Sequence, residues 1–340
     1  MQFTELKIDG YHRVIRATDK DFCAIVGIHN INLGTALGGC RVMAYDSEEA
    51  QLEDALRLSK GMTYKNALAG LKCGGGKATI NAPKATAEVL DKFAEVMDYI
   101  NKYSVEYITA GDVGTGPQEV AHLRERTEFV NGQQLGQDSG YATAFGVYMA
   151  MLGALNHRNR ELRQQDVFVE GLGKVGMRLT KFLKNEAKHL FVTDPHESRT
   201  QAAFTLHEAV PVRSREDGLR RAGVYSPCAL GGVLDWSTLE ILSPGDIVVG
   251  GANNLFMDDE MDVAYASKGI VVVPDYLANA GGVIIVTEGF EDAEWDDPGI
   301  LEKLRGIKFT TENVLEVAQY ERHTPMFIAN RMAEGIFNGS

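Results

Sequence analysis

The chain has 340 residues, of which 47 are acidic and 34 are basic, so its formal net charge at pH 7 is −13. This acidity argues against a nucleic acid partner and against binding to an anionic membrane. Apolar residues make up 44% and charged residues 24%, which is typical of globular proteins and excludes collagen, coiled coil and disorder. The length predicts about two domains.

Glycine is abundant, with 36 residues, whereas there are only 9 prolines. Disordered linkers are usually rich in both residues. We therefore expect the glycines to mark places where the backbone has a positive φ or closely approaches a ligand.

The four cysteines show neither C-x-x-C spacing nor the spacing of zinc ligands, so no metal site is predicted. The first residues contain no apolar signal segment, and no stretch is long and apolar enough to span a membrane. We therefore expect a cytoplasmic protein with reduced thiols. The cysteines are Cys23, Cys40, Cys73 and Cys228.

The first part of the chain mixes strand and helix patterns. Apolar and β-branched residues predict strands at residues 3–8 and 21–29. Ser47 can cap a helix that reaches about Lys60, and an apolar stripe predicts a second helix over residues 87–103. Residues 106–116 are expected to form a short strand that runs into a glycine-rich turn.

After residue 141 the pattern changes to apolar strands that alternate with helices. Such strands are typical of a parallel, doubly wound sheet, so the fold class is α/β with a Rossmann-type domain. Residues 131–141 hold three glycines and are expected to form the hinge. We predict a substrate-binding and oligomerisation domain from residues 1–135 with a C-terminal helix at about 320–340. A dinucleotide-binding domain is predicted over 140–318. The expected elements of this part are a helix at 142–157, strands at 166–171, 189–194, 246–254 and 269–275, a helix ending at 188, and helical structure over 311–337.

Gly171, Gly173 and Gly176 form a G-x-G-x-x-G pattern between a predicted strand and a predicted helix. In this context the glycines allow a tight turn, close approach to a pyrophosphate and close packing of helix on strand. Asp194 lies 18 residues after Gly176, at the end of the next strand. A carboxylate there accepts hydrogen bonds from ribose hydroxyls and repels a 2′-phosphate, so we expect NAD rather than NADP. The alternative is a glycine-rich turn with a capping aspartate.

Polar residues also follow the later strands. Asn253, Asn254 and Asp275 come at or after strand ends, where ligands bind in open α/β sheets. The asparagines could hold a nicotinamide amide or a substrate polar group. Turn formation is an equally good interpretation of the pair.

Residues 71–77 resemble a phosphate-binding P-loop but lack its spacing. We interpret them as a glycine-rich turn that delivers Lys77 to a small substrate. Lys65 lies twelve residues earlier, and two lysines in one cleft would lower the pKa of one of them. Asp112 is a candidate proton acceptor. A lone lysine is more often a solvated surface residue, and spacing alone does not bring these groups together.

These segments carry a resemblance to a known family. The sequence resembles the glutamate, leucine, phenylalanine and valine type of amino acid dehydrogenase, and is most similar to its leucine-oxidising branch. The matching segments cover nearly the whole chain in the family's order. They are residues 33–41, 54–67, 74–77, 110–115, 171–173, 227–231, 251–254, 274–276 and 279–282.

The resemblance implies reversible, NAD-dependent oxidative deamination of an L-amino acid to a 2-oxo acid and ammonia. It implies that Lys65 binds the substrate carboxylate, that Lys77 helps water to attack the imino carbon, and that Asp112 takes and returns protons at the amino nitrogen. It also implies further contacts: Gly38, Gly39 and Asn254 with the substrate, and Gly171, Gly173, Lys174, Val175, Gly176, Asp194, Thr143, Cys228, Ala229 and Asn254 with the cofactor.

The positions that match the family's side-chain pocket are aliphatic. They are Leu37, Ala110, Val283 and Val286. No cation is present there for a second carboxylate, so a branched-chain substrate (Leu, Val or Ile) is preferred to glutamate. The same residues could also be ordinary core residues.

Two departures from the family leave alternatives open. Gly111 stands where the leucine enzymes commonly carry Glu, which could enlarge the pocket for phenylalanine or tryptophan. A silent paralogue that senses NAD and an amino acid is a third reading. The sequence ends soon after residues 331–334 without a basic extension, so we expect a homodimer or homotetramer. The acidic residues 288–297 are expected to form a solvated loop.

Overall fold

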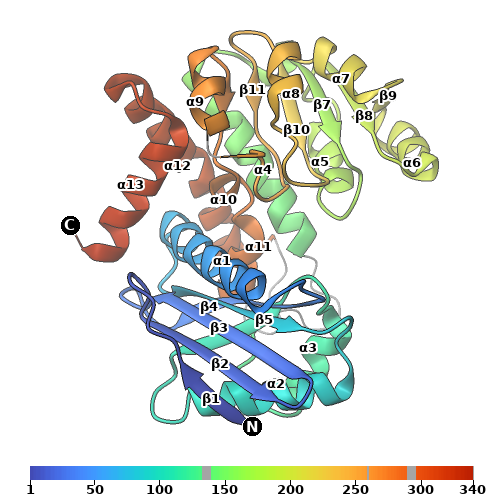
Figure 1. The fold of residues 1–340 in the computed structure, drawn as a ribbon. Coiled ribbons are helices and arrows are strands. Elements are labelled where there is room, and N and C mark those ends of the chain that lie inside the picture. The colour runs from blue at the N-terminus through green and yellow to red at the C-terminus, as the bar shows by residue number, and fades with distance from the viewer. Residues whose placement is uncertain (132–138, 259, 289–295, 340) are drawn as a thin grey trace. The chain divides into compact units, whose positions relative to one another are not determined.

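A computed structural model describes residues 1–131, 139–258, 260–288 and 296–339 (Figure 1). Most of the predicted hinge and of the predicted acidic loop lies outside these residues. The chain divides into two compact units. Of the described residues, the first unit holds 1–131 and 333–339, and the second holds 139–258, 260–288 and 296–332.

The first unit is built on a six-stranded sheet with the order β1-β2-β3-β5-β4-β6. Strands β1, β2, β3 and β5 pair antiparallel, whereas β4 lies parallel to both β5 and β6. The parallel strands place their carboxyl ends at one edge of the sheet. The strands are β1 (Gln2–Glu5), β2 (Arg13–Asp19), β3 (Phe22–Asn30), β4 (Ala36–Met43), β5 (Gly74–Asn81) and β6 (Tyr107–Gly111).

Helices cover both faces of this sheet (Figure 1). Helix α1 (Glu48–Leu68) begins at Ser47, whose side chain accepts a hydrogen bond from the Ala50 N–H. It packs on one face, while α2 (Ala87–Ile100) and α3 (Pro117–Arg124) lie on the other. The apolar stripe of α2 enters the main core together with inward residues of β2, β3 and β5.

The second unit contains a parallel six-stranded sheet with the order β12-β11-β10-β7-β8-β9. The strand order reverses between β7 and β10, which is where dinucleotides bind in doubly wound sheets. The predicted α/β class and parallel sheet are confirmed. The strands are β7 (Asp166–Glu170), β8 (His189–Thr193), β9 (Val210–Pro211), β10 (Val224–Pro227), β11 (Ile247–Val248) and β12 (Val271–Val272).

Several helices of the second unit connect these strands, and others follow the last strand in the chain (Figure 1). A short 3-10 turn, Leu162–Gln164, precedes β7. The helices are α4 (Ser139–His157), α5 (Gly176–Leu183), α6 (Glu197–His207), α7 (Arg215–Arg221), α8 (Trp236–Ile241), α9 (Glu260–Ser267), α10 (Asp275–Ala278), α11 (Gly281–Glu288), α12 (Pro298–Glu321) and α13 (Pro325–Asn338), the last of which runs into the first unit.

Several predicted elements are wrong. Residues 74–77 are not a turn but the start of the buried strand β5, because the three glycines at 74–76 have no side chains and let neighbouring elements pack against them. Helix α1 continues to Leu68, beyond the predicted end at Lys60. The predicted C-terminal helix begins earlier, at Pro298, and is interrupted where Arg322 adopts a left-handed conformation with φ 61°. Strands β2 and β4 were not predicted.

Candidate active site

Lys77 and Asp112 meet beside the carboxyl end of β6 in the first sheet. Lys77 lies on β5, Asp112 directly follows β6, and the Lys77 Nζ is 2.9 Å from the Asp112 Oδ2. The lysine side chain is only 7% exposed, whereas that of the aspartate is 22% exposed. The structure therefore pairs a buried ammonium with a carboxylate that solvent can reach.

Arg41 on β4 is the second cation beside Asp112. Its Nε donates a hydrogen bond to the Asp112 Oδ2 over 3.0 Å. Burial alone would raise the pKa of Asp112, but the charges of Lys77 and Arg41 outweigh it and hold this pKa below its ordinary value. Asp112 is therefore ionised at neutral pH.

Glycines bring the elements of this site close together. A Cβ at Gly38 would lie 1.8 Å from the Gly76 carbonyl oxygen, and one at Gly39 would lie 2.8 Å from the Asp112 Cβ. A Cβ at Gly75 would lie 2.1 Å from the Thr63 backbone nitrogen of α1. At these positions the close approach that the glycines were expected to mark is between elements of the protein.

Lys65 lies near the end of α1 and is partly exposed. The same helical turn is fixed on β5, because the Asn66 Nδ2 donates a hydrogen bond of 2.6 Å to the Gly74 carbonyl oxygen. This contact is three residues before Lys77. The turn of α1 that carries one predicted lysine is thus anchored to the strand that carries the other.

The glycine motif of the second unit forms the turn between β7 and α5. Gly171 has φ +91°, and a Cβ at Gly176 would lie 1.8 Å from the Gly171 carbonyl oxygen. By contrast, nothing lies within 4 Å of a Cβ placed at Gly173. A tight turn, close helix packing and an open backbone position are the features that a bound pyrophosphate requires. These residues fit a dinucleotide. Of the two positions between the last glycines, Lys174 is exposed and Val175 is partly exposed.

Asp194 follows β8 and its side chain is only 3% exposed. Its carboxylate accepts hydrogen bonds from the backbone N–H of Leu172 over 2.7 Å and of His196 over 2.9 Å. Although burial opposes ionisation, these donors and Arg199 lower the pKa of Asp194. The carboxylate therefore supports the glycine turn directly. This is the arrangement expected in the alternative interpretation, a glycine-rich turn with a capping aspartate.

The strand ends beside this turn carry the other predicted residues. Cys228 and Ala229 follow β10, and a Cβ at Gly171 would lie 2.6 Å from the Ala229 Cβ. Asn254 has φ 52°, and its backbone N–H donates a 2.7 Å hydrogen bond to Asp275, which is buried. Asn279 donates to the Asn253 Oδ1 over 2.8 Å, while its own buried Oδ1 has no partner in the described part of the chain.

The remaining predicted residues lie in both units. Leu37 is buried on β4 and Ala110 is partly buried on β6 of the first unit. Val283 and Val286 are partly buried on α11 of the second unit. Thr143 on α4 contacts the start of α11, since a Cβ at Gly282 would lie 2.8 Å from its hydroxyl oxygen.

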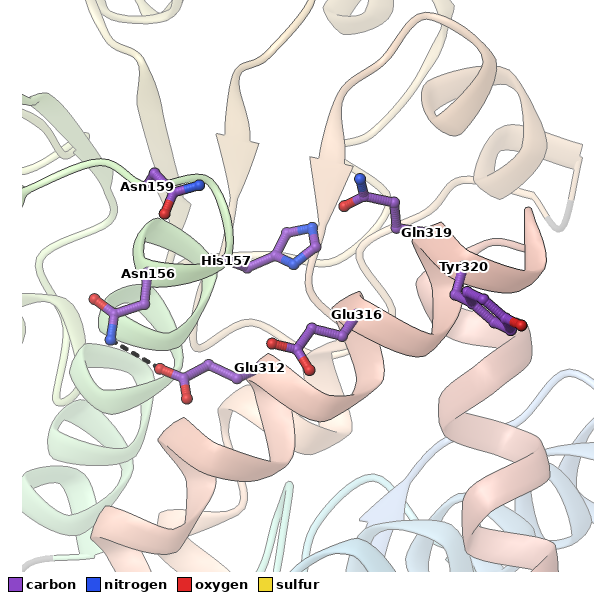
Figure 2. A pocket seen from close by; sticks show the side chains of 7 residues that line it. All are labelled: Asn156, His157, Asn159, Glu312, Glu316, Gln319 and Tyr320. Atoms are coloured by element: carbon purple, nitrogen blue, oxygen red, sulfur yellow. Dashed lines mark hydrogen bonds between the residues drawn. The ribbon is translucent and has the colours of Figure 1, made fainter.

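A separate hollow lies between α4 and α12 of the second unit (Figure 2). None of its lining residues was predicted to bind substrate or cofactor. Asn156 donates a hydrogen bond to Glu312 across it. The lining residues are Asn156, His157, Asn159, Glu312, Glu316, Gln319 and Tyr320.

Membrane-spanning helices and metal-binding clusters are both missing from the described residues. None of the helices they form combines the length and apolar composition needed to cross a bilayer. Within the same residues, no group of three or more His, Cys, Asp and Glu side chains is arranged to hold a metal ion.

The fold and the site together indicate an amino acid dehydrogenase, and comparisons with known proteins identify the family. A model of the Glu/Leu/Phe/Val dehydrogenase dimerisation domain matches residues 12–129, and the Glutamate/Leucine/Phenylalanine/Valine dehydrogenase model matches residues 196–335. Leucine dehydrogenase from Bacillus cereus is 36% identical, with 98% of this chain and 92% of the relative covered. The chain therefore belongs to the Glu/Leu/Phe/Val dehydrogenase family.

A solved structure shares the fold over almost the whole chain. L-tryptophan dehydrogenase from Nostoc punctiforme is 33% identical and superposes with a TM-score of 0.85, covering 97% of this chain and 96% of that one. Valine dehydrogenase from Streptomyces albus is also 33% identical, over 96% of this chain and 92% of the relative. Relatives with three different substrates in their names are thus about equally similar.

Sequence reasoning missed Arg41. It lies within the matching segment 33–41, but no role was assigned to it. Its position four residues after Leu37 on a parallel strand gave no signal that it would reach Asp112, which is 71 residues away.

Proposed function

We propose that this protein catalyses the reversible oxidative deamination of an aliphatic L-amino acid, with NAD as the oxidant. The observation that carries the proposal is the Lys77–Asp112 pair, 2.9 Å apart and placed at the carboxyl end of β6. The family gives the class of reaction. The pair supplies the two groups that such a reaction needs.

Proton transfer comes first. The amino group of a free amino acid is protonated at neutral pH and must lose that proton before hydride can leave the α-carbon. Asp112 is ionised and reaches solvent, so it can accept this proton. Lys65, by its match to the family, would hold the substrate carboxylate and place the α-amino group beside Asp112.

The bound dinucleotide supplies a hydride acceptor for the electron pair of the Cα–H bond. The substrate then carries an iminium carbon, to which one water molecule adds. Asp112 gives its proton to the nitrogen and, ionised again, accepts the proton that the attacking water gives up, while Lys77 holds that water by its oxygen. Ammonia leaves with the remaining hydroxyl proton as ammonium when the carbonyl of the 2-oxo acid forms, and Asp112, which solvent reaches, releases its proton to solvent.

The four positions that match the family's side-chain pocket support a branched aliphatic substrate. Leu37, Ala110, Val283 and Val286 are aliphatic, and none of them provides a cation for a second carboxylate. Such pockets separate apolar substrates by only about 1–3 kcal/mol per methylene, so several branched-chain amino acids should be accepted.

An aromatic substrate is the second candidate. The similarity to L-tryptophan dehydrogenase from Nostoc punctiforme supports it. Gly111 adds no support, because a side chain there would meet the Thr115 carbonyl oxygen at 3.0 Å and Val120 at 3.3 Å, so the glycine is explained by close packing of protein atoms.

NAD is proposed as the cofactor because the negative charge of Asp194 lies beside the glycine turn, where a 2′-phosphate would be repelled. The match to a dimerisation domain supports a homo-oligomer, for which we propose a dimer or tetramer. Asp194→Ala should then improve the use of NADP. An unchanged preference would overturn this account of cofactor choice.

The test of the function is NADH formation with a panel of L-amino acids. We expect leucine, valine and isoleucine to react fastest, with glutamate inactive. Faster turnover of phenylalanine or tryptophan would replace the substrate assignment, and no turnover with any amino acid would overturn the function.

A further inference from the structure

Arg41 links two carboxylates of the first unit. Its Nε donates to the Asp112 Oδ2 over 3.0 Å, and its Nη1 donates to the Asp54 Oδ2 over 2.9 Å. The arginine side chain is 19% exposed and that of Asp54 is 14% exposed. A guanidinium this deeply buried is costly unless its donors are paired, and each carboxylate satisfies part of it.

The contacts to Asp112 leave its two oxygens unequal. The Lys77 ammonium and the Arg41 guanidinium both contact Oδ2. Within the residues that the structure describes, no hydrogen bond reaches Oδ1. One oxygen is therefore held by two cations, while the other keeps its lone pairs for a proton from outside the chain.

The backbone of the Asp112 turn is attached to the strand that carries Arg41. The Thr115 hydroxyl donates to the Cys40 carbonyl oxygen and accepts from the Asp112 N–H. The Val42 N–H donates to the Val113 carbonyl oxygen over 2.9 Å. Arg41 thus lies between two residues whose backbones fix the turn, so backbone and side-chain contacts hold Asp112 to the same strand.

Asp54 is itself held from several sides. The Tyr45 hydroxyl donates to its Oδ2 over 2.8 Å, and Arg57 donates to its Oδ1 over 2.9 Å. Because Tyr45 and Arg57 fix this carboxylate, it can act as the support that orients the Arg41 guanidinium. The result is a chain of contacts from α1 through β4 to Asp112.

We propose that Arg41 is a positioning residue for the deamination: it holds Asp112 by Oδ2, so that Oδ1 is the oxygen that takes the amine proton, with Asp54 holding the guanidinium in place. This inference rests on the proposed function. The step transfers one proton from the substrate ammonium to Oδ1. Arg41 itself exchanges no proton and needs no contact with the substrate.

The other titratable groups that the structure describes near Asp112 are two cations in contact with it and three groups that are neutral at physiological pH. Lys77 faces it from β5 and Arg41 from β4. Cys40 on β4 and Tyr107 on β6 are buried, which raises the pKa of both groups, so they are neutral at physiological pH. Tyr45 is neutral for the same reason, with a further contribution from Asp54. Removing Arg41 therefore leaves Lys77 as the cation in direct contact with Asp112 among the described residues.

The test compares Arg41→Gln and Arg41→Lys with the wild type in kcat, KM and the pH dependence of kcat/KM for amino acid oxidation. For Arg41→Gln we expect kcat to fall about 10²-fold, because the base is misplaced, while KM changes little. The pH below which kcat/KM falls (the acid limb) should rise by about one unit or more, because Asp112 loses a nearby positive charge that lowers its pKa. Arg41→Lys should keep the acid limb of kcat/KM closer to that of the wild type, because the positive charge remains. It should still lower kcat, since an ammonium cannot contact Asp112 and Asp54 in the way the guanidinium does.

Arg16→Gln is the matched control. Arg16 lies on the same sheet and pairs with Glu48 of the same helix over 2.7 Å, but does not contact Asp112. Its kinetics should match the wild type. Thermal unfolding checks that each variant folds. If Arg41→Gln does not fold, the kcat of Arg41→Lys tests the inference: a lowered kcat supports it, and a kcat equal to that of the wild type overturns it.

The outcomes separate this inference from the function on which it rests. An active wild type with an unmoved acid limb in Arg41→Gln overturns the inference alone. A loss of kcat that only follows a loss of folded protein also overturns it. A wild type that oxidises no amino acid overturns the proposed function and this inference together.

Discussion

Two carboxylates, one in each unit, show how similar positions at a strand end acquire different roles. Asp112 follows β6 and Asp194 follows β8, and the pKa of each is lowered. Side-chain cations hold Asp112, which is 22% exposed. Backbone N–H groups hold Asp194, which is 3% exposed. The first arrangement leaves an oxygen available for chemistry, whereas the second uses the carboxylate to shape a turn.

The glycines of the two units also have different roles, in packing in the first unit and in a turn in the second. In the first unit Gly38 and Gly75 let strands and helix touch. In the second unit Gly171 and Gly176 form the turn, and Gly173 remains open. The first unit therefore uses its glycines to bring elements that carry polar side chains together, and the second uses them to form a tight turn with one open backbone position.

The largest expected effect comes from Lys77→Ala. Loss of the ammonium that assists the attacking water should lower kcat by about 10³-fold or more, while the dinucleotide still binds to the other unit. Initial rates and fluorescence titration with NADH measure the two properties. The exposed Lys72 provides the control, since Lys72→Ala should change neither. Retained activity in Lys77→Ala would remove this residue from the catalytic role.

A matched pair of glycine variants tests the contrast between the units. Gly38→Ala places a Cβ 1.8 Å from a carbonyl oxygen, so it should lower the yield of folded protein severely. Gly173→Ala adds a methyl group in open space and should leave the unfolding temperature nearly unchanged, yet weaken NADH binding about tenfold or more by crowding the pyrophosphate. Equal NADH affinities for Gly173→Ala and the wild type would contradict the contrast.

Asp194→Asn tests the structural role of the buried carboxylate. Loss of a charged acceptor for two backbone donors should reduce the free energy of unfolding at pH 7 by about 1–3 kcal/mol. Because the folded-state pKa of Asp194 is lowered, its ionised form stabilises the fold above the unfolded-state value near 3.8 and this stabilisation is lost as the pH falls through the folded-state value.

Denaturant unfolding should therefore show a difference between wild type and Asp194→Asn that shrinks as the pH falls below about 4. A constant difference from neutral to acid pH would show that the charge of Asp194 plays no part.

The smallest expected effect concerns substrate choice. If Val286 lines the proposed substrate pocket, Val286→Ala should shift the ratio of kcat/KM for phenylalanine over leucine upward by about tenfold, because the shortened side chain would enlarge that pocket. Val263, which is 60% exposed on α9, gives the control Val263→Ala. If both variants left the ratio unchanged, Val286 would not belong to the pocket.

The sequence predicted the parallel sheet of the second unit because its strands are apolar on both faces and end in turn residues. It failed at Gly74–Lys77, where three glycines have low strand propensity and only tertiary packing against α1 and β4 makes a strand. Lys77 and Asp112 were predicted singly, but the contact between them depends on strand order. Arg41 was missed for the same reason.

The most direct test of the account is the stoichiometry of the wild-type reaction with L-leucine and NAD. The account predicts equal amounts of NADH, ammonia and the corresponding 2-oxo acid, because one proton acceptor and one lysine-assisted water complete each turnover. NADH without ammonia, or no NADH with any amino acid, would contradict it.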